Sequence, residues 1–385
     1  MSATAPEPTA SSSTPLAGPE HADRVLALLA AGAAGDALGG VVEFTPASGI
    51  AAVHGPAGVT DAADLLAHEG AHALPITDDT QLTLYVLDGL LEWIEWQNDG
   101  VPADPAACVW LACLRWFATQ DGALPEGAPP APPRWIDAHA ELKVRRAPGT
   151  ACLSGLAEPG DGPAGRPAQS GFEGLRDGHA LGPVRDGAGA RGPARRVPRP
   201  PGGRPHARPP HRVGRGGRVR PRHRRPCCAA WTWPPRSRTP ARGSTAWARR
   251  PRTTRAAVAA AIDLAGTLDA DPGAPGALPA ALGEGWVAEE ALAIALYAAL
   301  TAQAAHPADP AAALALALRI GVNHDGDSDS TASLAGQVLG AAHGTAVFGA
   351  HDPADRAAAE ASVPGWIAER AVVLEAARRW SAATT

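Results

Sequence analysis

Cysteine is scarce in this sequence, and its spacing argues against two kinds of protein. The 385 residues include five cysteines, at positions 108, 113, 152, 227 and 228. Five are too few for a disulfide framework in a chain of this size, and no pair has the Cys-x-x-Cys spacing of a zinc site. We therefore expect a reducing compartment and predict a cytoplasmic protein.

The sequence also lacks a continuous run of about 20 apolar residues, the length that crosses a bilayer. Residues 25–34, preceded by Arg24, resemble the apolar core of a signal peptide. A polar leader with Glu20 and Asp23 precedes this run, however, and Asp36 follows it closely, which is not typical of a signal peptide. We expect neither secretion nor a membrane partner.

Acidic residues are almost absent from residues 171–255, which hold 22 of the 34 basic residues but only Glu173, Asp177 and Asp186. The rest of the chain carries 12 basic and 36 acidic residues, a balance of −24. An acidic body of this kind does not favour nucleic acid or an anionic membrane as a partner.

Residues 171–255 also lack a hydrophobic period, and Arg, Pro and Gly dominate them. Three interpretations compete: a basic insertion that binds nucleic acid, a disordered linker, and a stretch translated in the wrong reading frame. A genuine RNA-binding insertion would interleave aromatic residues with a folded module. Only Trp231, Trp233 and Trp247 occur here, without such a pattern.

The genetic code favours the third interpretation. Codons can be chosen for residues 171–185 that, read one nucleotide later, encode Asp-Ser-Lys-Gly-Cys-Gly-Thr-Val-Met-Arg. Residues 204–214, read with the same offset, give Ala-Leu-Thr-His-Gly-His-Pro-Ile-Gly-Trp. Both strings are typical of folded protein, and both appear in the same shifted reading frame. The freedom to choose codons does not readily explain two such strings. We predict a frameshifted, disordered segment that begins near Ser170 and returns to frame near residues 252–255.

Helical patterns occupy both sides of this segment, and no convincing β-alternation appears. Residues 1–19 read as a disordered leader, followed by two parts, 20–170 and 256–385, of one all-α globular body. The strongest helix pattern follows Asp79, where apolar residues recur on one face. Further helices are predicted over 106–117, 257–268, 286–304, 311–320, 330–343 and 364–381, and a loop over 120–133. Small residues at 332, 336, 340 and 344 leave one helix face nearly bare, so that another helix can pack closely against it.

Two Asp-rich segments carry the chemistry, and the first is Thr-Asp-Asp-Thr at residues 77–80. A Thr followed by acids is also a normal helix N-cap, but a cap needs only one oxygen and leaves the adjacent pair unexplained. Carboxylates this dense repel one another unless a cation lies between them. Hard divalent ions such as Mg²⁺ prefer carboxylate and hydroxyl oxygens as ligands.

The second segment contains Asp325, Asp327 and Asp329, with Ser330 directly after them. This spacing resembles an EF-hand calcium loop, which requires Gly at position six and Glu at position twelve. Counted from Asp325, those positions hold Ser330 and Gly336, so the EF-hand interpretation fails. A D-x-D-[ST] cluster remains, at the start of the helix with the bare face.

A third motif, Gly-Asp-Ala-Leu-Gly at residues 35–39, is followed by Glu43. The order and spacing of the three motifs resemble the ADP-ribosylglycohydrolase family, which includes the dinitrogenase-reductase-activating and ADP-ribosyl-acceptor hydrolases. The stretches 146–154 and 285–292 support the resemblance, which covers about residues 22–170 and 256–345.

The resemblance implies an all-α hydrolase that holds two Mg²⁺ ions between helices and cleaves the glycosidic bond between ADP-ribose and an acceptor. The substrate would be an ADP-ribosylated protein or small molecule. Asp36, Asn323 and His324 match positions with supporting or structural roles. The metal ligands implied by the motifs are Thr77, Asp78, Asp79, Asp327, Asp329 and Ser330, and the implied catalytic carboxylates are Glu43, Asp78 and Asp79. Which carboxylate acts as the base stays open, as does the acceptor.

The protein as written departs from the family within residues 171–255. The hidden strings resemble a glycine loop that cradles ADP-ribose and a second stretch near the site, and neither exists in this polypeptide. We therefore expect weak Mg²⁺ binding and poor turnover. The alternative is a non-catalytic protein that keeps the fold and binds ADP-ribose or metal.

Resequencing the coding DNA across codons 165–260 tests the frameshift. We expect one or two compensating insertions or deletions. If they are sequencing errors, the corrected protein regains its glycine loop; if they are genuine, the product keeps the metal ligands without a complete site. DNA whose second reading frame does not encode the two hidden strings would rule the frameshift out.

Overall fold

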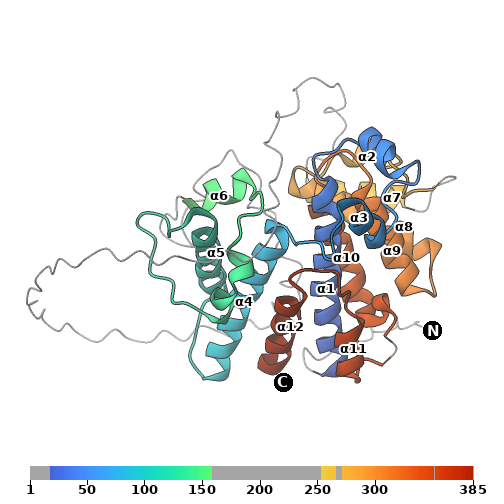
Figure 1. Cartoon of the computed structure of the whole chain (residues 1–385). Coiled ribbons are helices and arrows are strands. Elements are labelled where there is room, and N and C mark those ends of the chain that lie inside the picture. Colours follow the sequence, from blue (N-terminus) through green and yellow to red (C-terminus); the bar gives the residue numbers. More distant parts are fainter. Residues whose placement is uncertain (1–17, 158–252, 266–270, 351, 385) are drawn as a thin grey trace, which may run out of the picture. The chain divides into compact units, whose positions relative to one another are not determined.

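Helices form the framework of the part of the chain that the structure describes. A computed structural model describes residues 18–157, 253–265, 271–350 and 352–384 (Figure 1), all of which belong to one unit. These residues contain no strand; an isolated parallel bridge joins Leu74 and Ile367. The predicted all-α fold is confirmed. The predictions for residues 1–17 of the leader and 171–252 of the basic segment lie outside the described residues, as do residues 158–170 of the predicted N-terminal part.

Twelve α-helices occur within these ranges, accompanied by short 3-10 turns. The α-helices are α1 (Pro19–Val42), α2 (Ala47–His54), α3 (Ala62–Glu69), α4 (Asp78–Asn98), α5 (Pro105–Asp121), α6 (Thr150–Ala157), α7 (Thr254–Leu264), α8 (Ala288–Ala305), α9 (Pro310–Val322), α10 (Ser328–His343), α11 (Arg356–Ser362) and α12 (Arg370–Thr384). The 3-10 turns are η1 (Trp135–Ala138), η2 (Ala140–Lys143), η5 (Ala280–Leu282) and η6 (Gly344–Phe348).

Short polar side chains determine where several helices begin. Thr77 caps α4, and Asp104, Asp309 and Asp327 cap α5, α9 and α10 by accepting a hydrogen bond from a first-turn backbone N–H. Such a cap satisfies one of the donors that a helix start leaves unpaired. The helices α1 and α7 begin at Pro19 and Thr254, inside segments predicted to be disordered.

The helix predicted over 364–381 begins later, at Arg370. Backbone pairing prevents an earlier start, because the Leu74 N–H donates to the Trp366 carbonyl at 2.8 Å and the Ala368 N–H donates to the Leu74 carbonyl at 2.9 Å. These bonds place Ile367 in an isolated bridge with Leu74, and this pairing replaces the predicted helix start.

Of the described helix pairs, α1 and α10 make the most extensive contact. A Cβ atom at Gly35 would lie 2.2 Å from the Ala332 carbonyl oxygen, and one at Gly340 would lie 2.4 Å from the Ala27 carbonyl oxygen. The two backbones therefore touch, as the bare face predicts. Residues near the start of α1 lie against residues near the end of α10, so the two helices are antiparallel. The end of α1 therefore lies beside the start of α10 (Figure 1).

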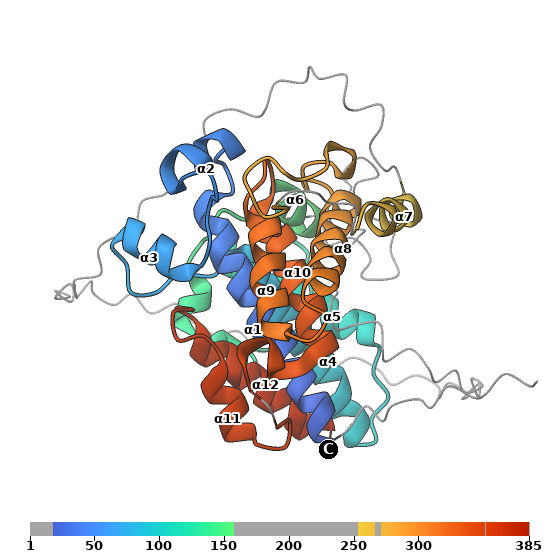
Figure 2. The ribbon, with the colours of Figure 1, turned by 90° about the vertical axis from the view of Figure 1, so that its right-hand side faces the viewer.

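The remaining helices pack around this pair. The helices α8 and α9 contact α10 and each other (Figure 2). On the other side, α12 contacts both α1 and α4, and α4 packs against α5 (Figure 1). The ends of α1, α4 and α10 are thereby fixed by large, separate contacts.

Among the described residues, α1 is long and apolar enough to span a bilayer by length and composition. This corrects the expectation that no such run exists, because the alanines and glycines of α1 keep the whole stretch apolar despite Asp23 and Asp36. Of its most apolar window, 94% is buried in the fold. The burial is that of a core helix.

Substituting alanine for Gly35 tests the contact between α1 and α10. Alanine favours a helix over glycine by about 1 kcal/mol, but here its Cβ would displace the Ala332 backbone, and overpacking costs about 1–3 kcal/mol. We expect Gly35→Ala to lower the free energy of unfolding by about 1 to 2 kcal/mol, measured by urea denaturation. The matched control is Gly365→Ala, whose Cβ meets nothing within 4 Å and which should change stability little. Equal effects of the two substitutions would contradict the contact.

Candidate metal centre

Three helix ends converge on the predicted carboxylates. Glu43 directly follows α1, Thr77 caps α4, and Asp327 caps α10. The N-terminus of a helix carries a partial positive charge and unpaired N–H groups. Two such ends therefore face this cluster and offset part of its negative charge.

Glu43, Asp327 and Asp329 form the tightest group of carboxylates. One oxygen from each lies within 4.8 Å of the others. Asp329 is only 4% exposed, while Glu43 and Asp327 are half-buried. Burial, with the charges of Glu43 and Asp327, raises the pKa of Asp329 well above its usual value. The group is an all-oxygen set that fits a hard divalent cation.

Asp36 organises the second group from the middle of α1. Its carboxylate is fully buried and accepts hydrogen bonds from the Thr77 backbone N–H at 2.9 Å, from the Thr77 hydroxyl, and from the Thr80 N–H at 3.3 Å. Burial, followed by the charge of Asp79, raises the pKa of Asp36 to about 7. Because the Thr77 hydroxyl donates its proton to Asp36, its oxygen keeps acceptor capacity for a cation.

Asp78 and Asp79 complete the second group. Asp78 is buried and accepts a hydrogen bond from the Gly149 N–H at 3.2 Å; burial, with the charges of Asp79 and Asp36, raises its pKa. The Ser330 hydroxyl donates to the Asp79 carboxylate at 2.5 Å. This bond connects the second group to the first across 251 residues of sequence.

The neighbouring polar residues support loops rather than the centre. Asp325, the first Asp of its segment, is exposed and accepts from the Ala47 N–H at 2.8 Å. The Asn323 side chain makes three backbone hydrogen bonds, two of them to Val59. His324 is buried, with a pKa that burial lowers, and its Nε2 lies 2.9 Å from the Thr331 hydroxyl.

The structure thus brings together all of the predicted site residues from three segments distant in sequence. They are Glu43, Thr77, Asp78, Asp79, Asp327, Asp329 and Ser330. Such a concentration of buried carboxylates with raised pKa values is costly in the absence of a cation. The donor set, carboxylates and hydroxyls, suits Mg²⁺.

Several residues near the centre had not been expected from the sequence. Phe44, next to Glu43, stacks on Trp286 with ring centroids 6.2 Å apart, and both rings are exposed, at 57% and 41%. Burial, with the charges of Asp79 and Asp78, raises the pKa of the Cys152 thiol to about 12. The Cys152 thiol is therefore uncharged at neutral pH. Aromatics scattered singly in a sequence give no signal that they will meet.

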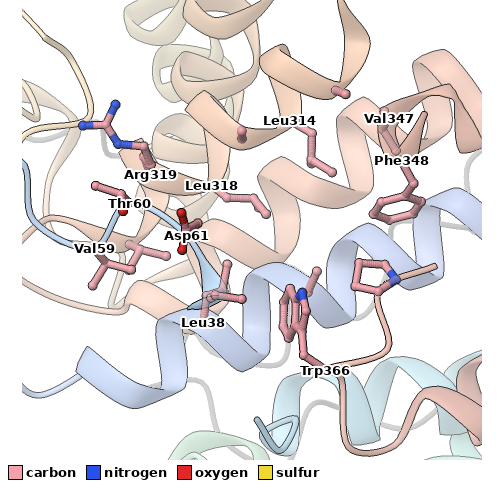
Figure 3. A pocket seen from close by; sticks show the side chains of 16 residues that line it. Leu38, Val59, Thr60, Asp61, Leu314, Leu318, Arg319, Val347, Phe348 and Trp366 are labelled. Carbon is pink, nitrogen blue, oxygen red and sulfur yellow. The ribbon is translucent and has the colours of Figure 1, made fainter. Parts of the chain in front are cut away.

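An apolar cavity of about 230 Å³ lies elsewhere in the fold, between α1 and α9 (Figure 3). Leu38, Leu314, Leu318, Phe348 and Trp366 point into it (Figure 3). None of the predicted metal ligands lines it. Thr60, Asp61 and Arg319 also border this cavity, which is separate from the metal centre because it shares none of the predicted ligands.

A family model described as ADP-ribosylglycohydrolase matches residues 17–351. No curated protein and no solved structure matches the chain. The match spans α1, α4 and α10, and hence every residue of the metal centre.

Replacing Asp329 with asparagine separates the stability of the fold from its metal response. Without metal, Asp329→Asn relieves repulsion, and we expect the free energy of unfolding to rise by about 1 to 2 kcal/mol. In the unaltered protein, Mg²⁺ at about 100 times its Kd should stabilise by about 2.7 kcal/mol, and EDTA should remove that gain. The variant should lose the Mg²⁺ response in thermal unfolding.

The control for this experiment is Asp325→Asn, two positions along the chain from Asp327. Because Asp325 binds the Ala47 N–H outside the cluster, this variant should keep the Mg²⁺ response. If Asp329→Asn kept the same response as Asp325→Asn, the assignment of Asp329 as a ligand would be wrong.

Proposed function

Because the chain belongs to the ADP-ribosylglycohydrolase family, we propose that it is a Mg²⁺-dependent hydrolase of the bond between ADP-ribose and an acceptor. The observation that carries the proposal is the cluster of Glu43, Asp327 and Asp329, linked to Asp79 through Ser330. The substrate proposed is an ADP-ribosylated protein or small molecule.

A cluster of carboxylates that can hold a cation suits the chemistry of cleaving this bond. Cleavage at the anomeric carbon of ribose passes through an oxocarbenium-like state, whose positive charge nearby carboxylates stabilise. Bound Mg²⁺ would act as a Lewis acid towards the ribose hydroxyls and lower the pKa of the attacking water. Thr77, Asp78 and Asp79 would hold one ion, and Asp327, Asp329 and Ser330 the other.

Glu43 is the carboxylate we propose as the proton acceptor. It lies at the end of α1, half-buried and within the trio, where it faces the cluster without belonging to either capped helix start. A general base must lie within hydrogen-bond reach of the water that it activates. Asp78 and Asp79 are the competing bases, but both stand at the start of α4 and are proposed as ligands of one ion.

The composition of residues 171–255 favours a second function, because it shows no pattern of side chains that would line a substrate pocket. In that case the chain binds metal and ADP-ribose without turnover. Isothermal titration calorimetry with ADP-ribose separates the two: binding without hydrolysis favours a non-catalytic protein. Restoring the hidden reading frame should raise turnover if the hydrolase proposal is right.

The direct test measures release of ADP-ribose from an ADP-ribosylated protein by the full chain. We expect slow release with Mg²⁺ that stops with EDTA, and a loss of about 100-fold in Asp79→Asn and Asp327→Asn. Asp325→Asn serves as the matched control and should retain the rate of the unaltered protein. Release that is unaffected by EDTA, or by both ligand substitutions, would contradict the proposal.

A further inference from the structure

A short segment near the C-terminus, residues 366–369, lies beside the chain that leads into α4. The Leu74 N–H and carbonyl are bound by Trp366 and Ala368, at 2.8 and 2.9 Å. The Trp366 ring points into the apolar cavity, against Leu38 of α1 (Figure 3). The segment is therefore anchored to the core and can act as a fixed support for the residues that it pairs with.

Glu369 and Arg146 grip the residue directly before the first metal ligand. The Ile76 N–H donates to Glu369 Oε2 at 3.0 Å, and the Ile76 carbonyl accepts from Arg146 Nη1 at 2.8 Å. Arg146 Nη2 in turn donates to Glu369 Oε1 at 2.6 Å. The Glu369 side chain is 3% exposed and that of Arg146 is 12% exposed. Both polar backbone groups of Ile76 are thus held by one buried ion pair.

The next residue is held from the opposite side. The Thr77 N–H and hydroxyl both donate to Asp36 of α1. Consecutive residues, Ile76 and Thr77, are therefore bound by groups on different elements, which fixes the backbone torsions at the start of α4. That start places Asp78 and Asp79 opposite Ser330.

Arg146 has a second connection to the centre through its own chain. Three residues later, the Gly149 N–H donates to Asp78 at 3.2 Å. Between them Ala147 has a φ of 53°, a left-handed conformation that an alanine adopts only where its surroundings impose it. The anchors on both sides, at Arg146 and Gly149, impose that conformation.

We propose that Arg146 and Glu369 are positioning residues of the metal centre, because their ion pair fixes Ile76 and thereby the direction of Thr77, Asp78 and Asp79. The inference rests on the proposed function, since it needs the centre to bind a divalent cation. Glu369 lies beyond residue 351, where the family match ends. The centre is completed by a part of the chain that the family match does not include.

A buried ion pair by itself stabilises a fold weakly, because desolvation of the two charges offsets their attraction. Breaking one would destabilise the protein wherever it lies, so the test must separate metal affinity from stability. Asp88 offers a matched control: it is fully buried and pairs with Arg115 at 2.6 Å. It lies nine residues along α4 from Asp79, roughly 13 Å away.

The experiment titrates the full-length chain with Mn²⁺, an ion that electron paramagnetic resonance detects directly. We expect Glu369→Gln to weaken Mn²⁺ affinity about tenfold, as loss of residues that orient metal ligands does. Arg146→Lys keeps the charge but replaces the rigid fork that binds Ile76 and Glu369 with a single ammonium group, so it should weaken affinity by a smaller factor. Asp88→Asn should lower the melting temperature and leave Mn²⁺ affinity within about twofold of the unaltered value.

Each outcome decides a separate point. If the unaltered protein does not bind Mn²⁺, the proposed function fails and the positioning role with it. If it binds and Glu369→Gln binds equally well, only the positioning role is overturned. Equal weakening in Asp88→Asn would show general destabilisation and also overturn it. Should Glu369→Gln not fold, Arg146→Lys gives the same decision.

Discussion

The contact between the glycines of α1 and α10 determines where the metal centre forms. Because Gly35 and Gly340 lie against the backbone of the opposite helix, the two helices run antiparallel and in close contact. Glu43, directly after α1, is thereby placed beside Asp329 at the start of α10, while Asp36 of α1 binds Thr77 at the start of α4. Larger side chains at this interface would separate the carboxylates even if every ligand remained.

The buried carboxylates of the candidate metal centre lower the stability of the fold. Burial raises the pKa values of Asp36, Asp78 and Asp329, which means that their charged forms are unfavourable where they lie. Helix N-termini and hydroxyl donors such as Thr77 and Ser330 compensate part of this cost. The rest is what a divalent cation would relieve, so affinity for the ion and instability without it have the same physical origin.

Features that depend on local sequence could be predicted, and those that depend on distant pairing could not. The Thr-Asp-Asp-Thr and D-x-D-[ST] motifs each contain ligands and a cap within a few residues, so both were visible. Glu369, by contrast, is a single acid that becomes important only by meeting Ile76, 293 residues away. The start of the helix predicted from residue 364 was wrong for the same reason, because pairing with Leu74 overrides the local helical pattern and α12 begins at Arg370.

Metal binding and turnover have separate requirements in this chain. The proposed ligands come from both sides of residues 171–255, from the start of α4 before them and the start of α10 after them. The entropic cost of closing a connection grows only with the logarithm of its length, so a long connection of any sequence penalises the centre little. Any part of a substrate pocket that this connection would form depends, in contrast, on the side chains that the connection contains. On the proposed function, an altered connection would therefore affect recognition of ADP-ribose far more than coordination of the cation, and the two properties could be lost independently.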